Sequence, residues 1–556
     1  MTTPTEPILP ARVMLPPALV ARLPQPAWAE RLREGWQQLL SHYGVPGRAE
    51  VTLVGGEGPR PVWVTIGEVA CPYPGEVLEQ AQAWVMGGSA GGDLAEVGSE
   101  DSAEILHLAC LAILQRQPAR WLTPDTTAHY QARLLNLLEP ADLPAPEALQ
   151  RLLAFLLNWH IPIGDVAAVA QTLRAHPPAE TDAVTLREAL FQQLRPHPLA
   201  IEVNLDTLRA LTFDANAGDK PFALLRDALF YELGLRLPDV RWLPTPDLPD
   251  GAFRFRLNAL TTLPYTGIPP GHIFVNATPD QLPDLPAQPA RHPAGLYPGA
   301  FLPESYRLLV TAQGLTAYTP LGYLILALDQ QVRALAGSWL DQTVCQRDWD
   351  KLRANYPTLI DAALQRWTPA LITHTARLLL AEGLSIRNWR HILQALLDFD
   401  VIVTDPVQLI VLDPRLPLAA AEALPQAASA VNLAAYTRTS LKTYITHKLS
   451  GGTSTLNVHL LETELEQMLV NQAGLDWETH LARVEATLGD AFRAAVRETL
   501  DDPTPPLPAI LTSVDVRPVV RDLLAAEWPD LPIISYNDLD PAANLYTLSR
   551  IALSAR

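Results

Sequence analysis

Residues 378–399 read LLLAEGLSIRNWRHILQALLDF, and this stretch predicts two helices joined by a tight connection. Gly383 suits the end of the first helix, because glycine adopts the positive φ found at helix C-termini without strain. Ser385 suits the N-cap of the second helix. Trp389 lies on the apolar stripe of that helix, where a role in the core is commoner than contact with a partner. The stripe comprises Ile386, Trp389, Ile392, Leu393 and Leu396.

The sequence around this joint predicts a multidomain α+β chain. A strand (PLAIEVNL) is followed by a helix that Pro221 opens and Gly234 closes, and then by a second strand (FRFRLNAL) in which apolar and polar residues alternate. The last hundred residues read strand, helix, strand, which predicts a parallel βαβ unit. The predicted parts are a small α+β subdomain (185–264), a short proline-rich insertion (265–320), a helical subdomain (321–450) and a C-terminal βαβ subdomain (451–556).

The first 180 residues repeat part of this order at low identity. RPVWVTIGEV alternates as FRFRLNAL does, ILHLACLAILQRQPARWLTP aligns with YLILALDQQVRALAGSWLDQ, and NWHIPIGDVAAVAQTLRA aligns with AEGLSIRNWRHILQALLD. Three matches in one order favour an internal duplication over chance similarity between amphipathic helices. The fold is therefore expected to be partly duplicated, with degenerate copies of the α+β subdomain at 1–95 and of the helical subdomain at 96–180.

Composition narrows the classes of partner. The 41 Lys and Arg residues against 60 Asp and Glu residues give a net charge of −19, which repels nucleic acid and anionic membrane surfaces. Cys71, Cys110 and Cys345 are widely spaced and predict neither a disulfide framework nor a zinc site. No signal peptide is recognisable, and no run approaches the roughly 18 apolar residues that a spanning helix needs. We therefore expect a cytoplasmic protein that binds neither nucleic acid nor membrane.

No catalytic motif is recognisable in the sequence. It contains no HExxH, no GxxxxGK[ST] and no strand-linked GxGxxG. The best nucleophile candidate is Ser513, at the end of a predicted strand with Asp515 and Tyr536 expected nearby, but no histidine base accompanies it. The competing role for Ser513 is the N-cap of the following helix. We expect no enzymatic activity, no cofactor and no metal.

Taken in order, these segments resemble the FHIPEP family, the FlhA-like export-gate proteins of flagella and type III secretion systems. The joint at 378–399 is similar to the family's run of the type LLREGVSIRDLRTILEAL. PLAIEVNLDTL, LRDALFYELGLRLPDVRW, FRFRLNAL and the turn Pro270, Gly271, His272 look like its first cytosolic subdomain. WLDQTVCQRDWDKLRANYPTLIDAAL resembles the segment that leads into the joint, and PAILTSVDVRPVVRDLLAAEWPDLPIISYNDL resembles the family's C-terminal end. The resemblance covers residues 190 to 556.

The resemblance implies the cytosolic half of the family without the membrane half that forms the gate, whose place the degenerate first copy takes. The inserted subdomain, where the family is expected to dock chaperone and substrate complexes, is shortened here. Phe301 and Tyr306 in that insertion, together with Trp389, are the candidate partner contacts. The segment 404–431 has no counterpart in the family.

Three functions follow as hypotheses. The leading one is a non-enzymatic FHIPEP-like scaffold that binds other proteins. The first alternative is a component that acts directly in type III protein export by docking substrate–chaperone complexes or gate subunits, and the second is a hydrolase that uses Ser513. The family suggests nine-fold rings, whereas the first copy could cover the assembly surface, so a homo-oligomer and an intrachain pseudo-dimer both stay open.

Overall fold

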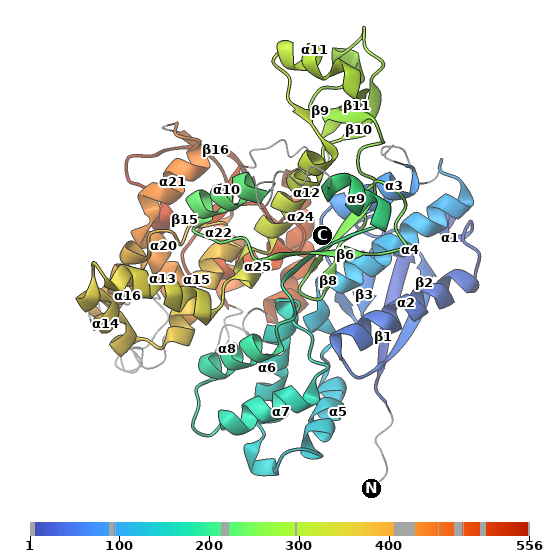
Figure 1. Cartoon of the computed structure of the whole chain (residues 1–556). Helices are drawn as coiled ribbons and strands as arrows, with labels where there is room; N and C mark the ends of the chain where they lie inside the picture. The colour runs from blue at the N-terminus through green and yellow to red at the C-terminus, as the bar shows by residue number, and fades with distance from the viewer. Residues whose placement is uncertain are drawn as a thin grey trace. The chain divides into compact units, whose positions relative to one another are not determined.

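The computed structural model describes residues 6–87, 94, 96–212, 222–294, 297–404, 429–453, 455–471, 481, 483–500 and 508–553. The chain divides into unit 1 (Met1–Leu229 and Arg236–Leu335) and unit 2 (Phe230–Leu235 and Ala336–Arg556). Figure 1 labels helices and strands of both units. Most of the segment 404–431 lies outside the described residues. Among the helices of the described ranges, none combines the length and the apolar character that crossing a membrane requires.

Unit 1 contains two four-stranded sheets of the same topology. Their strand orders are β2-β1-β3-β4 and β6-β5-β7-β8, and in each sheet the first pair is parallel and the other two pairs are antiparallel. This agreement is what an internal duplication predicts. The strands are β1 (Ile8–Leu15), β2 (Arg48–Gly55), β3 (Trp63–Ile66), β4 (Val69–Ala70), β5 (Leu199–Val203), β6 (Val240–Pro244), β7 (Phe253–Leu257) and β8 (Leu260–Thr261).

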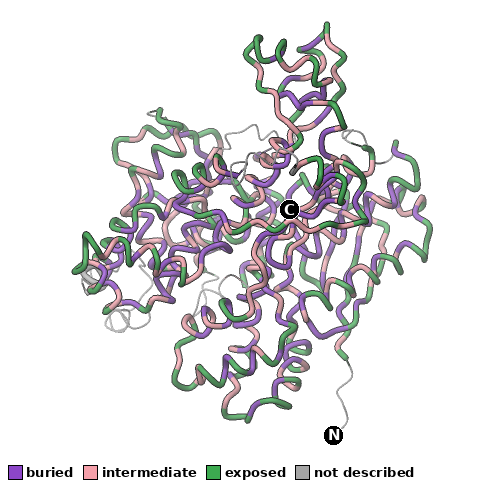
Figure 2. Tube along the Cα trace, in the orientation of Figure 1, coloured by how far each residue is buried: buried purple, intermediate pink, exposed green. Residues whose placement is uncertain are grey.

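The burial of β5 and β7 follows from their side chains. β7 alternates between buried and half-buried residues, as its period of two predicts, and β5 is buried throughout. Figure 2 colours the trace of the chain by burial. Glu202 on β5 is only 1% exposed, and its carboxylate pairs with Arg254 at 2.6 Å and with Arg256. The two arginines on the polar face of β7 therefore neutralise a charge that the central strand buries.

Helices cover these sheets and continue into a helical part of unit 1. Along α2, buried apolar side chains recur every three to four residues, so that one face of the helix packs inward. The helices are α1 (Pro17–Val20), α2 (Ala27–Tyr43), α3 (Glu76–Val85), α4 (Ser99–Arg116), η1 (Pro118–Trp121), α5 (Pro124–Leu135), η2 (Pro140–Asp142), α6 (Pro146–Asn158), α7 (Val166–Ala175), α8 (Ala183–Leu194), α9 (Leu205–Thr212), α10 (Ala223–Leu233) and α12 (Pro320–Ala334); the C-terminal end of α10 belongs to unit 2.

The proline-rich insertion forms a third sheet with its own small core. Its strand order is β10-β11-β9-β12 and all three pairs are antiparallel. The core contains Ile273, Val275, Leu282, Leu302 and Val310. The elements are β9 (His272–Val275), η5 (Pro279–Gln281), β10 (Gln288–Arg291), β11 (Pro298–Pro303), η6 (Glu304–Tyr306), α11 (Arg307–Ala312) and β12 (Ala317–Tyr318).

Unit 2 contains the helix joint of residues 378–399. Gly383 follows α15 with φ +67°, as predicted. The predicted cap at Ser385 is wrong, because α16 begins at Trp389 and the side chain of Asn388 accepts the backbone N–H of His391 at 3.1 Å. The helices are η7 (Ala336–Trp339), α13 (Gln342–Arg353), α14 (Pro357–Arg366), α15 (Pro369–Ala381), α16 (Trp389–Thr404), α20 (Ala430–Ser440) and α21 (Lys442–Ser450).

The C-terminal sheet of unit 2 is wholly parallel, in the order β15-β14-β13-β16. The predicted βαβ unit is present as β14, α25 and β15, whereas β13 and β16 were not predicted. The elements are β13 (Thr455–Leu461), α22 (Thr463–Asn471), the π-helical turn η8 (Glu485–Gly489), α24 (Asp490–Thr499), β14 (Ala509–Thr512), α25 (Arg517–Ala525), β15 (Ile533–Ser535), η9 (Tyr536–Asp538) and β16 (Asn544–Ile551).

The two aligned joints make the same backbone contact. In the first, the N–H of Ile163 donates to the carbonyl of Tyr43 at 2.8 Å, and in the second the N–H of Ile386 donates to the carbonyl of Leu233 at 2.9 Å. The glycine after each acceptor ends its helix with φ +75° and +74°, respectively. We propose that the chain contains an internal duplication, and we call residues 1–180 the first copy and residues 185–450 the second copy.

Candidate partner-binding pocket

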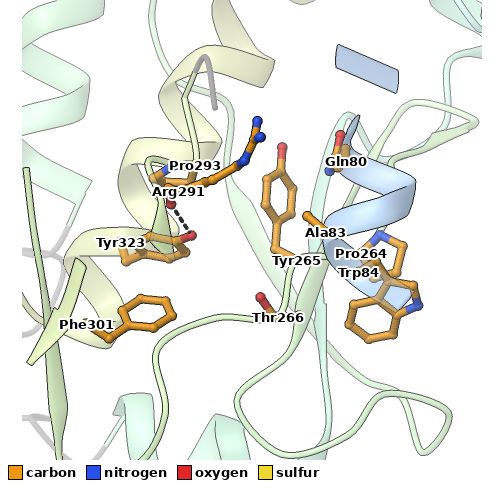
Figure 3. Close-up of a pocket in the computed structure, with 10 residues that line it drawn as sticks. All are labelled: Gln80, Ala83, Trp84, Pro264, Tyr265, Thr266, Arg291, Pro293, Phe301 and Tyr323. Atoms are coloured by element: carbon orange, nitrogen blue, oxygen red, sulfur yellow. Dashed lines mark hydrogen bonds between the residues drawn. The ribbon is translucent and has the colours of Figure 1, made fainter. Parts of the chain in front are cut away.

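A pocket in unit 1 gathers side chains that are distant in the sequence. Tyr265 follows β8, Phe301 belongs to β11 and Tyr323 belongs to α12. Helix α3 of the first copy lies opposite them and supplies Trp84 (Figure 3). The cavity volume is about 30 Å³, which is space for about two water molecules. The other lining residues are Gln80, Ala83, Pro264, Thr266, Arg291 and Pro293.

Ring contacts hold the aromatic wall in place. Tyr265 stacks on Phe253 with centroids 5.0 Å apart, and Tyr323 packs edge-to-face on Phe274 at 5.2 Å and on Phe301 at 6.1 Å. Burial raises the pKa of Tyr265 to about 12, although the nearby amide of a glutamine lowers it slightly. Tyr265 is therefore neutral at physiological pH and acts as a surface for packing.

The charged and amide side chains of the pocket lie at one end of it. The guanidinium of Arg291 pairs with the carboxylate of Glu79 at 2.6 Å, and Glu79 belongs to α3. The amide of Gln80 donates to the carbonyl of Leu263 at 3.2 Å, and the Tyr323 hydroxyl donates to the carbonyl of Arg291 at 2.9 Å. In Figure 3 the Arg291 guanidinium and Gln80 point toward one end, and Phe301 and Trp84 lie toward the other.

Of the three residues predicted as partner contacts, one lines this pocket. Phe301 is 7% exposed there. Tyr306 lies half-buried in η6 and is not among the lining residues. Trp389 is 6% exposed and packs edge-to-face on Trp349 at 5.5 Å, within the helical core of unit 2. No sequence pattern pointed to Trp84, since it contacts residues about 180 positions away.

The surroundings of Ser513 do not assemble a catalytic triad. Its backbone N–H and the Thr512 hydroxyl both donate to one carboxylate oxygen of Glu466, at 2.8 and 2.6 Å. His459 on the neighbouring strand instead pairs with a serine of β16 at 2.7 Å. The predicted N-cap role is also wrong, because α25 begins after Val516 without a side-chain cap. In the part of the chain that the structure describes, no group of three or more His, Cys, Asp or Glu could hold a metal ion.

A buried ion cluster connects the joint of unit 2 to its C-terminal sheet. The carboxylate of Glu382 binds Arg438 and Arg517, each at 2.7 Å, and Arg438 also binds Asp538 at 3.0 Å. Burial raises the pKa of Glu382, but attraction to the arginines outweighs burial and lowers it to about 2. Glu382 is therefore charged at neutral pH, and the cluster has a structural role.

The architecture and the joint define a class: the chain has the fold of the cytosolic domain of type III export gates. It resembles the structure of the Chlamydia pneumoniae CdsV protein with 25% identity and a TM-score of 0.51, over 64% of this chain and 98% of that one. The structure of the C. pneumoniae CdsV and CdsO protein complex gives 25% identity and a TM-score of 0.53, over 64% and 97%. Residues 191–544 match the FHIPEP family, and the chain belongs to that family.

Sequence relatives agree with this membership. The low calcium response locus protein D of Yersinia pestis is 24% identical over 361 residues, which are 64% of this chain and 47% of that protein. The flagellar biosynthesis protein FlhA of Bacillus subtilis is 21% identical over 369 residues, 65% and 50% of the two chains. The chain thus spans about half the length of the curated relatives it matches, and the resemblance predicted from the sequence is confirmed.

Proposed function

We propose that this chain is a non-enzymatic scaffold that binds other proteins. The observation that carries the proposal is the aromatic pocket, whose lining of apolar rings with a few polar groups is that of a recognition site, although its volume of about 30 Å³ is small for one. The net charge of −19 favours protein partners over nucleic acid. A cytoplasmic location is part of the proposal.

A second candidate is a direct role in protein export, by docking export substrates, their chaperones or gate subunits. It is favoured by the likeness to CdsV in the CdsV and CdsO complex, where a protein of this fold is seen with a partner. Both candidates use protein surfaces and differ only in the partner. Identification of the captured proteins separates them, because export components support the second and unrelated proteins support the first.

The test is crosslinked capture of the full chain from its own cells, with variants that alter the pocket. Trp84→Ala removes one wall, and Tyr297→Ala is the matched control, because Tyr297 is 49% exposed in the insertion and does not line the pocket. We expect a defined partner to be retained by Tyr297→Ala and lost by Trp84→Ala. Equal recovery with both variants would exclude the pocket as the binding site.

The proposal also includes an intrachain pseudo-dimer. Within unit 1, the two-residue turn between β7 and β8 lies against the joint of the first copy. The N–H of Ala259 donates to the carbonyl of His160 at 3.0 Å, the Asn258 amide donates to the carbonyl of Trp159 at 3.0 Å, and the Gln115 amide donates to the carbonyl of Ala259 at 3.2 Å. Ala259 is 2% exposed, so the turn is buried in this contact.

Light scattering after size exclusion, across a concentration series, tests this part. If the first copy occupies the surface that would otherwise bind a neighbour, the mass stays near 60.9 kDa at every concentration. A mass several times larger at all concentrations would mean that a different surface assembles the chain into an oligomer, and the pseudo-dimer would not be its assembled form.

A further inference from the structure

The ion pair at the pocket indicates what kind of group this end of the pocket accepts. Arg291 and Glu79 are 25% and 50% exposed, respectively, so the pair is open to solvent, and it joins the insertion to α3 of the first copy. A carboxylate thus already sits on the guanidinium beside an apolar cavity. Arginine binds carboxylates through directional charge-assisted hydrogen bonds, so another carboxylate can take the place of Glu79 without new chemistry.

The other end of the pocket indicates an apolar group. Phe301 is 7% exposed and Tyr323 is 6% exposed, and Trp84 faces them from α3. The volume of about 30 Å³ is far below the roughly 300 Å³ of a typical small-ligand site. A ring or a branched aliphatic side chain therefore enters only when the gap between α3 and the insertion widens, and the pair between Glu79 and Arg291 spans that gap.

Resting on the proposed scaffold function, we propose that this pocket binds an apolar side chain that carries or adjoins a carboxylate, and that the incoming carboxylate replaces Glu79 on Arg291. The ligand is a segment of a partner protein, either a C-terminal apolar residue or an apolar residue next to an acidic one. The first copy is then part of the binding site, because α3 supplies both the Trp84 wall and the competing carboxylate.

The competition has a direct consequence for affinity. Replacing Glu79 with Gln removes the competing charge while keeping the shape of the side chain, so the ligand binds more tightly. An exposed ion pair contributes about 0.2–1 kcal/mol, so we expect the affinity to increase by about 1.4- to fivefold. Replacing Arg291 with Gln removes the group that holds the carboxylate, and the preference for a charged ligand disappears.

Ligand-observed NMR titration of the full chain tests the inference with small probes. N-acetyl-phenylalanine carries the ring and an α-carboxylate, N-acetyl-aspartyl-phenylalanine amide carries the ring beside an acidic side chain, and N-acetyl-phenylalanine amide has no charge. We expect at least one charged probe to bind more tightly than the uncharged one in the wild type, more tightly still in Glu79→Gln, and no better than the uncharged one in Arg291→Gln. Which charged probe binds better distinguishes a C-terminal residue from an internal acidic motif.

Matched controls are Arg209→Gln and Glu304→Gln, which change exposed charges outside the pocket; these residues are 63% and 61% exposed, respectively. Arg291→Lys keeps the charge, so it should retain part of the preference if Arg291→Gln is poorly folded. Equal binding of all three probes by the wild type and Arg291→Gln, or no binding even by Glu79→Gln, would overturn the inference. Capture of a partner that depends on Trp84 would still support the scaffold in that case.

Discussion

Replacing Glu382 with Gln should destabilise unit 2 by about 3 kcal/mol. The Glu382 side chain is 15% exposed and binds Arg438 and Arg517, which are 3% and 4% exposed. Removing one partner of a buried ion pair typically costs about 3–5 kcal/mol, because the remaining charge stays buried. The lower end of that range applies here, since Asp538 remains on Arg438 at 3.0 Å.

The pH dependence gives a second value for the same interaction. Folding lowers the pKa of Glu382 from 4.5 to about 2, because the attraction of the arginines exceeds the opposing effect of burial. A carboxyl group whose pKa falls on folding contributes its stability above pH 4.5, and the contribution is lost as the pH falls from 4.5 to about 2. That difference in pKa corresponds to roughly 3 kcal/mol of folding stability, which agrees with the loss expected when one partner of a buried ion pair is removed.

The assay has to follow unit 2 separately, because a chain of two units need not unfold in one step. Urea-dependent hydrogen exchange of peptides from α15 and β14, read by mass spectrometry, gives the local free energy of unfolding at pH 7. Urea unfolding at several pH values between 2 and 7 then tests how the free energy of unfolding changes with pH. The control is Glu304→Gln, whose carboxylate is 61% exposed and binds Arg307 at 3.0 Å, with an expected change below about 0.5 kcal/mol. A loss below about 1 kcal/mol for Glu382→Gln, or an unchanged acid dependence in that variant, would refute the reasoning.

Three further substitutions test the joints by thermal or urea unfolding. Gly234→Ala should lower the free energy of unfolding by about 1–3 kcal/mol more than Gly314→Ala does. A Cβ at Gly234 would meet the backbone nitrogen of Arg387 at 2.4 Å, whereas a Cβ at Gly314, also at positive φ, would meet open space. Equal losses of stability in the two variants would contradict the close approach. His160 has φ +54°, so His160→Gly should be about 1 kcal/mol more stable than His160→Ala, and the reverse order would refute strain at this position. Trp389→Ala should cost about 3–5 kcal/mol as a core truncation, and a loss below about 1 kcal/mol would contradict a core role.

The sequence correctly predicted those features that depend only on neighbouring residues, such as helix ends and the alternation of a strand. The glycines at 234 and 383 end their helices with positive φ, and β7 alternates, because each depends on residues within one or two turns of the chain. Ser385 failed as a cap for a tertiary reason. The backbone N–H of Ile386 donates to the carbonyl of Leu233, which holds the chain out of a helix until Asn388. A serine two residues after a glycine carries no sign of that contact.

The pocket was only half predictable. Phe301 could be singled out because it lies in the insertion, where the resemblance to the family predicts docking, but its opposite wall comes from α3, in a part of the chain outside the family match. Hydrophobic patterns and secondary-structure propensities depend on residues that are close in the sequence. Trp84 and Phe301 are far apart in the sequence and come together only through the packing of the first copy. The strand β16 was missed for another reason, since most of its residues are exposed and give no apolar period.

The two joints also indicate what the first copy lacks. In the second copy, the carbonyl of Gly383 accepts a hydrogen bond from the ammonium group of Lys448, which belongs to α21. The first copy has no aligned counterpart of that helix, and its equivalent carbonyl, on His160, accepts the N–H of Ala259 instead. His160 is 5% exposed, and a buried carbonyl at the end of a helix needs a donor, so the turn supplies at this joint the hydrogen bond that Lys448 supplies at the other. This exchange ties residues 1–180 to the turn between β7 and β8 within unit 1. Under the proposed duplication, it gives a physical reason for the first copy to persist beside an FHIPEP domain.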